Sequence, residues 1–299
     1  MAVTHALKIG VPVLALAALL GGFIPLGLHF WRAHQRAVAV EQARAEVCRR
    51  VGLARRAGSA YVSLPYSLLH NERKAKLGQS LFTDRRLAST RWRMCCICHA
   101  PEKNGSDMKV HAGLLTRPFQ NAVLGTALLH DGRATNLTEA IRVMIEDGRF
   151  CAGGALSNVT TRLAKDAGMA QVFRACYEDG LTETNVLDAI DQFARTQLSS
   201  GCAFDEWVDG RADAFNETQR AGLGVFEAHK CVDCHDGPAL GALKTYEGKR
   251  VIGLRGLPRR TLYLSGGSCS DLGAVLAMMP GGEMTDDERV SLLAFLKTL

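Results

Sequence analysis

Two short segments of the 299-residue chain place a pair of thiols and an imidazole in the same frame. Residues 95–99 read CCICH and residues 231–235 read CVDCH, so both contain the pattern Cys-x-x-Cys-His. With ten cysteines and nine histidines in the chain, one chance occurrence is expected on the order of once in a hundred such chains. The repetition therefore indicates a specific chemical use of these side chains.

The spacing suits the covalent attachment of a porphyrin. Two thiols three residues apart reach the two vinyl groups of haem, and the histidine that follows lies under the iron. Paired zinc motifs usually lie about 15–20 residues apart and do not need that histidine, and a redox dithiol needs a βαβ setting that is not visible. We therefore predict two haem c groups. Their attachment residues are Cys95, Cys98, Cys231 and Cys234, and their proximal iron ligands are His99 and His235.

Haem c is attached on the outer side of the bacterial inner membrane, so we expect the globular part of the chain in the periplasm. That compartment is oxidising and permits disulfides. Six further cysteines are compatible with disulfides, whose pairing the sequence does not give, or with buried thiols: Cys48, Cys96, Cys151, Cys176, Cys202 and Cys269.

The net charge of +6 is confined to the N-terminal part of the chain. Residues 1–60 hold eight basic and two acidic side chains, and the rest of the chain carries 28 of each sign. No basic face for nucleic acid follows from that balance, so we exclude nucleic acid as a partner. An anionic membrane surface is the favoured partner of the basic segment.

One long apolar run lies within this basic segment. From Ile9 to Phe30 no residue carries a formal charge, and at about 1.5 Å per residue the run spans a hydrocarbon core of about 30 Å. A cleaved signal peptide is the alternative, with residues 37–39 (AVA) as its cleavage site. We expect an uncleaved, single-pass inner-membrane anchor over residues 1–31. The arginines after the run favour a cytoplasmic domain, but the haem chemistry favours the periplasm.

Beyond the anchor the sequence predicts a mainly α protein. Residues 32–60 are basic and repeat alanine and valine at three- and four-residue steps, which predicts a helical linker ending near Gly58. Helical spacing with polar N-terminal residues then recurs in residues 136–144, 185–197, 217–229 and 285–299. No GxGxxG or GxxxxGK[ST] phosphate loop is present. We expect a first haem c domain over residues 61–200 and a second over residues 201–299.

Several motifs around the two frames resemble those of the bacterial di-haem cytochrome c peroxidase family, which includes the MauG-type enzymes. Residues 77–87 are similar to its LGxxLFxDxRL segment, residues 129–137 to WDGRAxxL and residues 217–226 to ExxxxGxxxF. Further matches are Leu254-Arg255, Tyr263, Gly267-Ser268 and residues 274–278 (AVLAM). The resemblance covers residues 64–299. It implies two mostly helical, cytochrome c-like domains that face each other, each with one haem.

The resemblance also implies the sixth ligands of the two irons. In the peroxidases electrons enter at the C-terminal haem, whose methionine ligand corresponds to Met278, with Met279 as the alternative. Ligation by histidine and methionine raises the potential of the iron. A removable histidine in the loop after the first frame corresponds to His111. Met108 and an open or water-filled position are the alternatives there.

The positions of the family's distal acid–base pair differ in this chain. Counted from the DGRA segment, the glutamine of the family falls on Ala140 and its glutamate on Phe150. Glu146 or Asp147 would substitute as the catalytic group if the loop is shifted by a few residues. The family's tryptophan between the haems is replaced by His130.

The family's calcium site between the domains is altered as well. Its RNxPT run is reduced to Arg117-Pro118 without the asparagine, and its Thr-x-Pro-Tyr segment appears as residues 260–263 (RTLY). A guanidinium at the position of a cation's ligand disfavours calcium. Calcium is therefore doubtful, and Arg260 is a candidate to supply positive charge in its place.

Taken together, these features predict a membrane-anchored, periplasmic di-haem c-type cytochrome that transfers electrons between a donor and an acceptor protein. A peroxidase that reduces hydrogen peroxide to water is the first alternative, and it would use Glu146 or Asp147 with a labile His111. A haem-bearing subunit of a larger membrane redox complex is the second alternative. The sequence does not identify the electron donor or the acceptor.

Overall fold

Polar side chains cap the longer helices of this protein, as their N-terminal sequences predicted. A computed structural model describes residues 61–88 and 93–299, with isolated positions between residues 31 and 53. Asn136 accepts a hydrogen bond from the amide of Glu139, and Asn216 and Thr285 each form a reciprocal capping box. The four helices expected from the sequence are all present, with ends shifted by a few residues.

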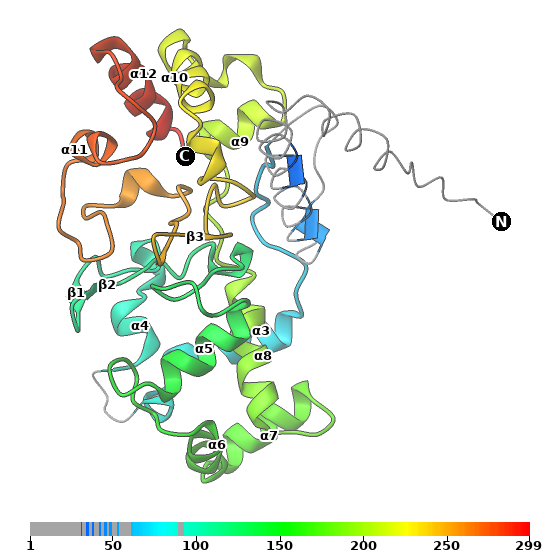
Figure 1. The fold of residues 1–299 in the computed structure, drawn as a ribbon. Coiled ribbons are helices and arrows are strands. Elements are labelled where there is room, and N and C mark those ends of the chain that lie inside the picture. The colour runs from blue at the N-terminus through cyan, green and yellow to red at the C-terminus, as the bar shows by residue number, and fades with distance from the viewer. Residues whose placement is uncertain are drawn as a thin grey trace, which may run out of the picture. The chain divides into compact units, whose positions relative to one another are not determined.

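Ten helices and four short strands occur among the described residues from 61 onward (Figure 1). The helices are α3 (Glu72–Phe82), α4 (Cys95–Cys98), α5 (Leu137–Glu146), α6 (Leu156–Ala164), α7 (Ala167–Cys176), α8 (Glu183–Ala194), α9 (Ala203–Val208), α10 (Glu217–Ala228), α11 (Leu272–Ala277) and α12 (Asp286–Leu296). The strands form two antiparallel pairs, β1 (Val110–His111) with β2 (Leu114–Leu115) and β3 (Thr245–Tyr246) with β4 (Lys249–Arg250). Short 3₁₀ turns cover Arg85–Leu87, Pro101–Lys103, Ala122–Leu124, Ala212–Ala214, Cys231–Asp233 and Leu257–Arg259.

The same kind of helix pair occurs in the first half, residues 61–200, and in the second half, residues 201–299. α3 packs on α8 and α10 packs on α12, as Figure 1 shows. A Cβ atom on Gly78 would lie 1.9 Å from the carbonyl oxygen of Ala189, and one on Gly222 would lie 1.9 Å from that of Ser291. Only glycine therefore permits this close approach at the two crossings.

A hydrophobic cluster surrounds each helix pair. The rings of Phe82 and Phe193 in the first half, and those of Phe226 and Phe295 in the second, both have centroids 5.4 Å apart. One cluster contains residues between 64 and 198 together with Ala239, and the other contains residues between 204 and 299. The division into two haem domains at residues 200 and 201 stays a prediction, and the two clusters lie on either side of it.

A buried ion pair joins residues 62–64 to the second cluster. Arg255 donates from Nη1 to Oδ1 of Asp205 and from Nη2 to the carbonyl oxygen of Val62, both at 2.6 Å. Its guanidinium lies 4.6 Å from the ring centroid of Phe204. The amide of Leu64 also donates to Asp205, at 2.9 Å. The start of the first half is therefore held on the second half by one buried charge pair.

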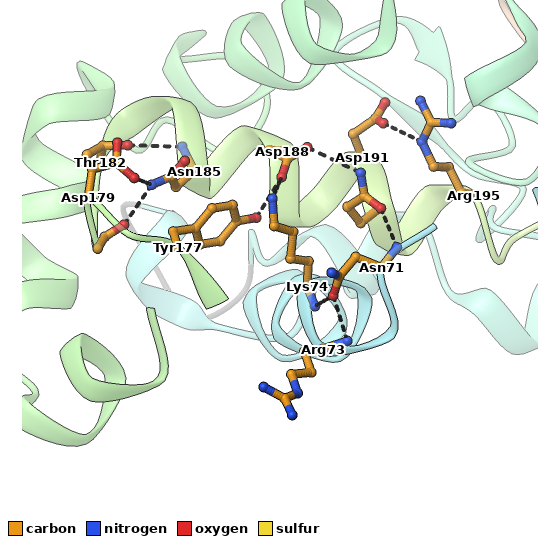
Figure 2. A network of polar contacts seen from close by, with 12 residues as sticks. Asn71, Arg73, Lys74, Tyr177, Asp179, Thr182, Asn185, Asp188, Asp191 and Arg195 are labelled. Carbon is orange, nitrogen blue, oxygen red and sulfur yellow. Dashed lines mark hydrogen bonds and ion pairs between the residues drawn. The ribbon is translucent and has the colours of Figure 1, made fainter. Parts of the chain in front are cut away.

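Polar contacts reinforce the crossing of α3 and α8. Figure 2 shows Lys74 of α3 and Tyr177 both directed at Asp188 of α8. Nζ of Lys74 lies 3.1 Å and the hydroxyl of Tyr177 2.9 Å from this carboxylate. Burial, and then the hydrogen bond to Asp188, raises the pKa of Tyr177, so its hydroxyl stays protonated and donates.

The predicted membrane anchor from Ile9 to Phe30 lies outside the described residues. Among the residues that are described, no helix has both the length and the apolar character that a membrane span needs. The described positions from Trp31 to Arg49 are helical and Leu53 is not, whereas the expected end near Gly58 lies outside them. The chain divides into residues 1–45 and residues 46–299, and both Cys-x-x-Cys-His frames lie in the second unit.

Candidate functional site

A cavity of about 740 Å³ lies beside the first Cys-x-x-Cys-His frame. α4 forms a single helical turn, and the amide of His99 donates to the carbonyl oxygen of Cys95 at 2.8 Å. The thiols of Cys95 and Cys98 are therefore one turn apart, and both line the cavity together with His99. A volume of this size is in the range of cofactor and ligand pockets, about 300–1,000 Å³. We call it the first haem cavity.

His99 is oriented as an iron ligand requires. Its Nδ1 lies 3.1 Å from the carbonyl oxygen of Gly105, so this nitrogen donates and Nε2 keeps its lone pair. Burial lowers the pKa of His99, which keeps the ring neutral at neutral pH. Gly105 has a φ of 70°, and an added Cβ would lie 2.7 Å from the amide nitrogen of Gln120. The glycine therefore lets the backbone approach close enough to present its carbonyl.

The second frame places its histidine in the same way. Residues Cys231–Asp233 form a 3₁₀ turn, and the amide of His235 donates to the carbonyl oxygen of Cys231 at 2.8 Å. Nδ1 of His235 lies 3.3 Å from the carbonyl oxygen of Leu240 and 3.2 Å from that of Ile252. Burial lowers the pKa of His235 to about 4. Both histidines are thus neutral, with one nitrogen held by backbone, and both fit a haem iron.

The wall of the first haem cavity contains the two positions at which the family's distal pair was expected. Ala140 of α5 and Phe150, in the loop after α5, both line it. Among the described residues that line the cavity, none is an aspartate or a glutamate. Its charged side chains are instead basic, namely Arg93, Arg117, Arg149 and Arg250. The cavity therefore favours an anionic occupant but offers no carboxylate for proton transfer.

Glu146 and Asp147, the expected substitutes, do not line this cavity. The amide of Leu156 donates to Glu146 at 3.0 Å, so this side chain caps the start of α6. Asp147 pairs with Arg149 at 2.7 Å, and hydrogen bonds from Arg149 lower the pKa of Asp147 to about 2. Ile145 of α5 is the residue that faces the core. Glu146 follows it by about 100° around the helix axis and is directed elsewhere.

His111 does line the first haem cavity. It lies on β1, and Nε2 is 2.7 Å from Oδ2 of Asp107. A ring nitrogen of His111, a carboxylate oxygen of Asp107 and the thiol of Cys98 all lie within 4.8 Å of one another. Met108, the alternative ligand, is not among the described residues that line the cavity. Asp107 was not predicted as the partner of His111, and its nearness in the chain is the one sequence signal for this pair.

Cys151 is a further residue that the sequence argument left without a role. It is buried, lines the first haem cavity, and its thiol is hydrogen-bonded to that of Cys95. Arg93 secures this loop by donating to the carbonyl oxygens of Gly148 and Phe150, at 2.6 and 3.0 Å. No disulfide joins the cysteines that the structure describes.

Met278 and His130 occupy contrasting environments. Met278 is the C-terminal cap residue of α11 and is 57% exposed, so its role as the second iron's sixth ligand stays a prediction.

His130 lines the first haem cavity, and its Nε2 lies 2.9 Å from the carbonyl oxygen of Leu115. Burial lowers the pKa of His130, and this ring is neutral where the family has a tryptophan.

Comparisons with known sequences agree with these features. Residues 72–213 match the family described as di-haem cytochrome c peroxidase. The methylamine utilization protein MauG of Methylophilus methylotrophus is 30% identical over 174 residues, which cover 54% of this chain and 52% of MauG. The cytochrome c551 peroxidase of Nitrosomonas europaea is 28% identical over 274 residues, covering 77% of this chain and 80% of that enzyme. The chain thus spans about half of the first relative and most of the second.

Solved structures share the fold at low sequence identity. A MauG-like protein associated with microbial copper homeostasis has a TM-score of 0.66 and 19% identity, covering 82% of this chain and 94% of its own. The diheme peroxidase BthA from Burkholderia thailandensis has a TM-score of 0.62 and 16% identity, covering 80% and 90%. The family binds two c-type haems, and this chain carries both attachment frames. Residues 72–213 of this mainly helical chain therefore match a di-haem cytochrome c peroxidase domain, and the solved structures show that the chain shares the fold of MauG-like and diheme peroxidase proteins.

Proposed function

We propose that this chain passes electrons between redox proteins in the periplasm and is held at the inner membrane by residues 1–31. The observation that carries the electron-transfer role is the apolar wall of the first haem cavity. Ala140 and Phe150 lie where the family resemblance leads us to expect a polar distal pair. Haem bound at the two frames would supply reversible one-electron chemistry at its iron.

Peroxide reduction would require polar, proton-carrying side chains in this part of the cavity wall. A side chain must carry a proton from one peroxide oxygen to the other, and polar groups must stabilise the separating charge. The methyl group of Ala140 and the ring of Phe150 do neither. Glu146 is engaged with α6 and Asp147 with Arg149. The carbonyl of Gly105 orients His99 and burial keeps its ring neutral, which suits electron transfer.

One observation favours peroxide reduction as a second candidate. His111 and Asp107 form a histidine–carboxylate pair at the edge of the first haem cavity, with 2.7 Å between Nε2 and Oδ2. A carboxylate that orients a histidine is a common arrangement for a general acid–base group. Burial raises the pKa of Asp107, but the hydrogen bonds from His111, the amide of Lys109 and Thr116 together outweigh it and lower this pKa, so the carboxylate stays ionised. Five of the matched relatives are named as peroxidases.

Peroxide turnover and spectroscopy of the haem-loaded protein separate these functions. The electron-transfer proposal predicts a low-spin first haem that stays six-coordinate on half-reduction, and no turnover with a reduced cytochrome donor. Rapid turnover that is lost in His111→Gln would establish the peroxidase instead. His70→Gln is the matched control, because His70 lies outside the cavity and bonds to the carbonyl oxygen of Leu68.

The proposed location has its own test. After cell fractionation, the full chain should stay with inner membranes through an alkaline wash, and a protease added to spheroplasts should digest the haem-bearing part. A chain that is released by the wash would refute the anchor. Protection from the protease would refute the periplasmic orientation.

A further inference from the structure

Three arginines from separate segments converge where the two halves of residues 61–299 meet. Arg117 precedes Pro118, Arg250 ends β4, and Arg260 follows the Leu257–Arg259 turn. All three line one small cavity of about 20 Å³. Arg117 and Arg250 also line the first haem cavity, so the cluster extends into that larger space.

These guanidiniums are incompletely paired within the protein. The Nε atoms of Arg117, Arg250 and Arg260 are buried and have no hydrogen-bond partner. Arg117 donates from Nη2 to Ser265, and Arg260 donates from Nη2 to the carbonyl oxygens of Gly253 and Arg255. No aspartate or glutamate among the described residues forms an ion pair with any of the three. The partners that they do have are neutral.

Buried like charges without a counter-charge are unfavourable. Burial, and then the charges of Arg117 and Arg260, lowers the pKa of Arg250 to about 9. Burial lowers the pKa of Arg117 to about 10. Burial, and then the charge of Arg117, lowers the pKa of Arg260 to about 10 as well. A folded protein retains such a group of cations when an anion neutralises it. The small cavity has room for about one water molecule, so a larger anion must extend its charged end from a neighbouring space.

The cluster lies beside both Cys-x-x-Cys-His frames. On one side, Arg117 lines the first haem cavity with His99. On the other, Nδ1 of His235 is 3.2 Å from the carbonyl oxygen of Ile252, and Arg260 donates at 2.6 Å to that of Gly253, the next residue. These guanidiniums would therefore be available to the carboxylates of a haem held at either frame.

We propose that Arg117, Arg250 and Arg260 form a shared anion site that binds the propionate carboxylates of both haems and takes the place of a divalent cation between the two halves. The planar, permanently charged guanidinium suits carboxylates because it offers two parallel donors. The sequence singled out Arg117 and Arg260 separately at altered calcium positions, and the fold adds Arg250. This inference rests on the binding of two haems and is independent of peroxide turnover.

Reduction potentials of the haem-loaded protein test the site. Reduction removes positive charge from the iron, and a nearby guanidinium stabilises that state. Arg250→Gln should therefore lower both potentials, and Arg260→Gln chiefly that of the haem at residues 231–235. We expect at least a tenfold change in the reduction equilibrium, which is 59 mV for one electron. Arg259→Gln, a loss of the same charge from the exposed neighbouring residue, should change it less than threefold because solvent screens that position.

Four further outcomes discriminate among explanations. Arg260→Lys should retain most of the potential if charge is what matters, and it serves if a glutamine variant does not fold. Equal effects of Arg260→Gln and Arg259→Gln would overturn the proposal. Effects that appear only in phosphate or sulfate buffer would assign the site to a free anion and overturn the propionate assignment. Stoichiometric calcium in the unmodified protein, or potentials that respond to a chelator, would refute the replacement of a cation.

Discussion

Two glycines in α10 provide a matched test of how closely the helices of the second half approach each other. Alanine is favoured over glycine in a helix interior by about 1 kcal/mol. A Cβ atom on Gly224 would meet no heavy atom within 4 Å. One on Gly222 would lie 1.9 Å from the carbonyl oxygen of Ser291 and 2.8 Å from Cβ of Phe295. The same substitution should therefore have opposite effects two residues apart.

The magnitude follows from these distances. Ordinary contact begins near 3.4 Å, so α10 and α12 must separate by about 1.5 Å to admit the methyl group at Gly222. Overpacking of this kind costs about 1–3 kcal/mol, and the separation also weakens the Phe226–Phe295 contact, by up to about 1 kcal/mol. With about 2 kcal/mol for the overpacking, about 1 kcal/mol for the ring contact and a helix-propensity gain of about 1 kcal/mol, Gly222→Ala should destabilise the protein by about 2 kcal/mol. Gly224→Ala should stabilise it by about 1 kcal/mol.

Thermal unfolding of the haem-loaded proteins, followed by circular dichroism at 222 nm, measures the difference. At about 2–4 °C per kcal/mol for a domain of this size, Gly224→Ala should raise the Tm by about 2–4 °C and Gly222→Ala should lower it by about 4–8 °C. If Gly222→Ala melts at or above the unmodified protein, the close crossing of α10 and α12 is not what stabilises this half.

Three other substitutions probe the ion pair, the cavity and pH. Arg255→Gln should cost about 3–5 kcal/mol in denaturant unfolding, because it leaves a buried carboxylate without its partner; a loss below about 1 kcal/mol would contradict this. Phe150→Glu places a carboxylate in the first haem cavity and should raise peroxide turnover by about 10²–10⁴-fold, whereas an unchanged rate would argue against the missing distal group. The carbonyl of Gly281, and then Glu288, raises the pKa of His229, so the stability from this proton is complete below about pH 6.5 and is lost as pH rises through the raised pKa. His229→Gln should therefore flatten the fall of Tm as pH rises above about 6.5, and an unaltered slope would assign the fall to other groups.

Features that depend only on residues close together in the chain could be predicted from the sequence. The spacing of Cys95, Cys98 and His99 is set within one helical turn, so their joint use was predictable without knowledge of the fold. Asn216 and Thr285 marked the starts of α10 and α12, because a cap acts on amides two or three residues away. The mainly helical class was predictable for the same reason, because three- and four-residue spacing and polar N-terminal residues are signals between near neighbours.

What faces the cavity was decided only by the tertiary structure. Glu146 and Ala140 lie on the same helix, and the packing of α5 on its neighbours determines that Ala140 lines the cavity and Glu146 caps α6. Arg117, Arg250 and Arg260 are far apart in the chain, and no periodicity relates them. Their convergence arises because the two halves meet at one junction. The sequence by itself predicted both haem-attachment frames, because that chemistry is local, whereas the polarity of the cavity wall depends on contacts between distant segments.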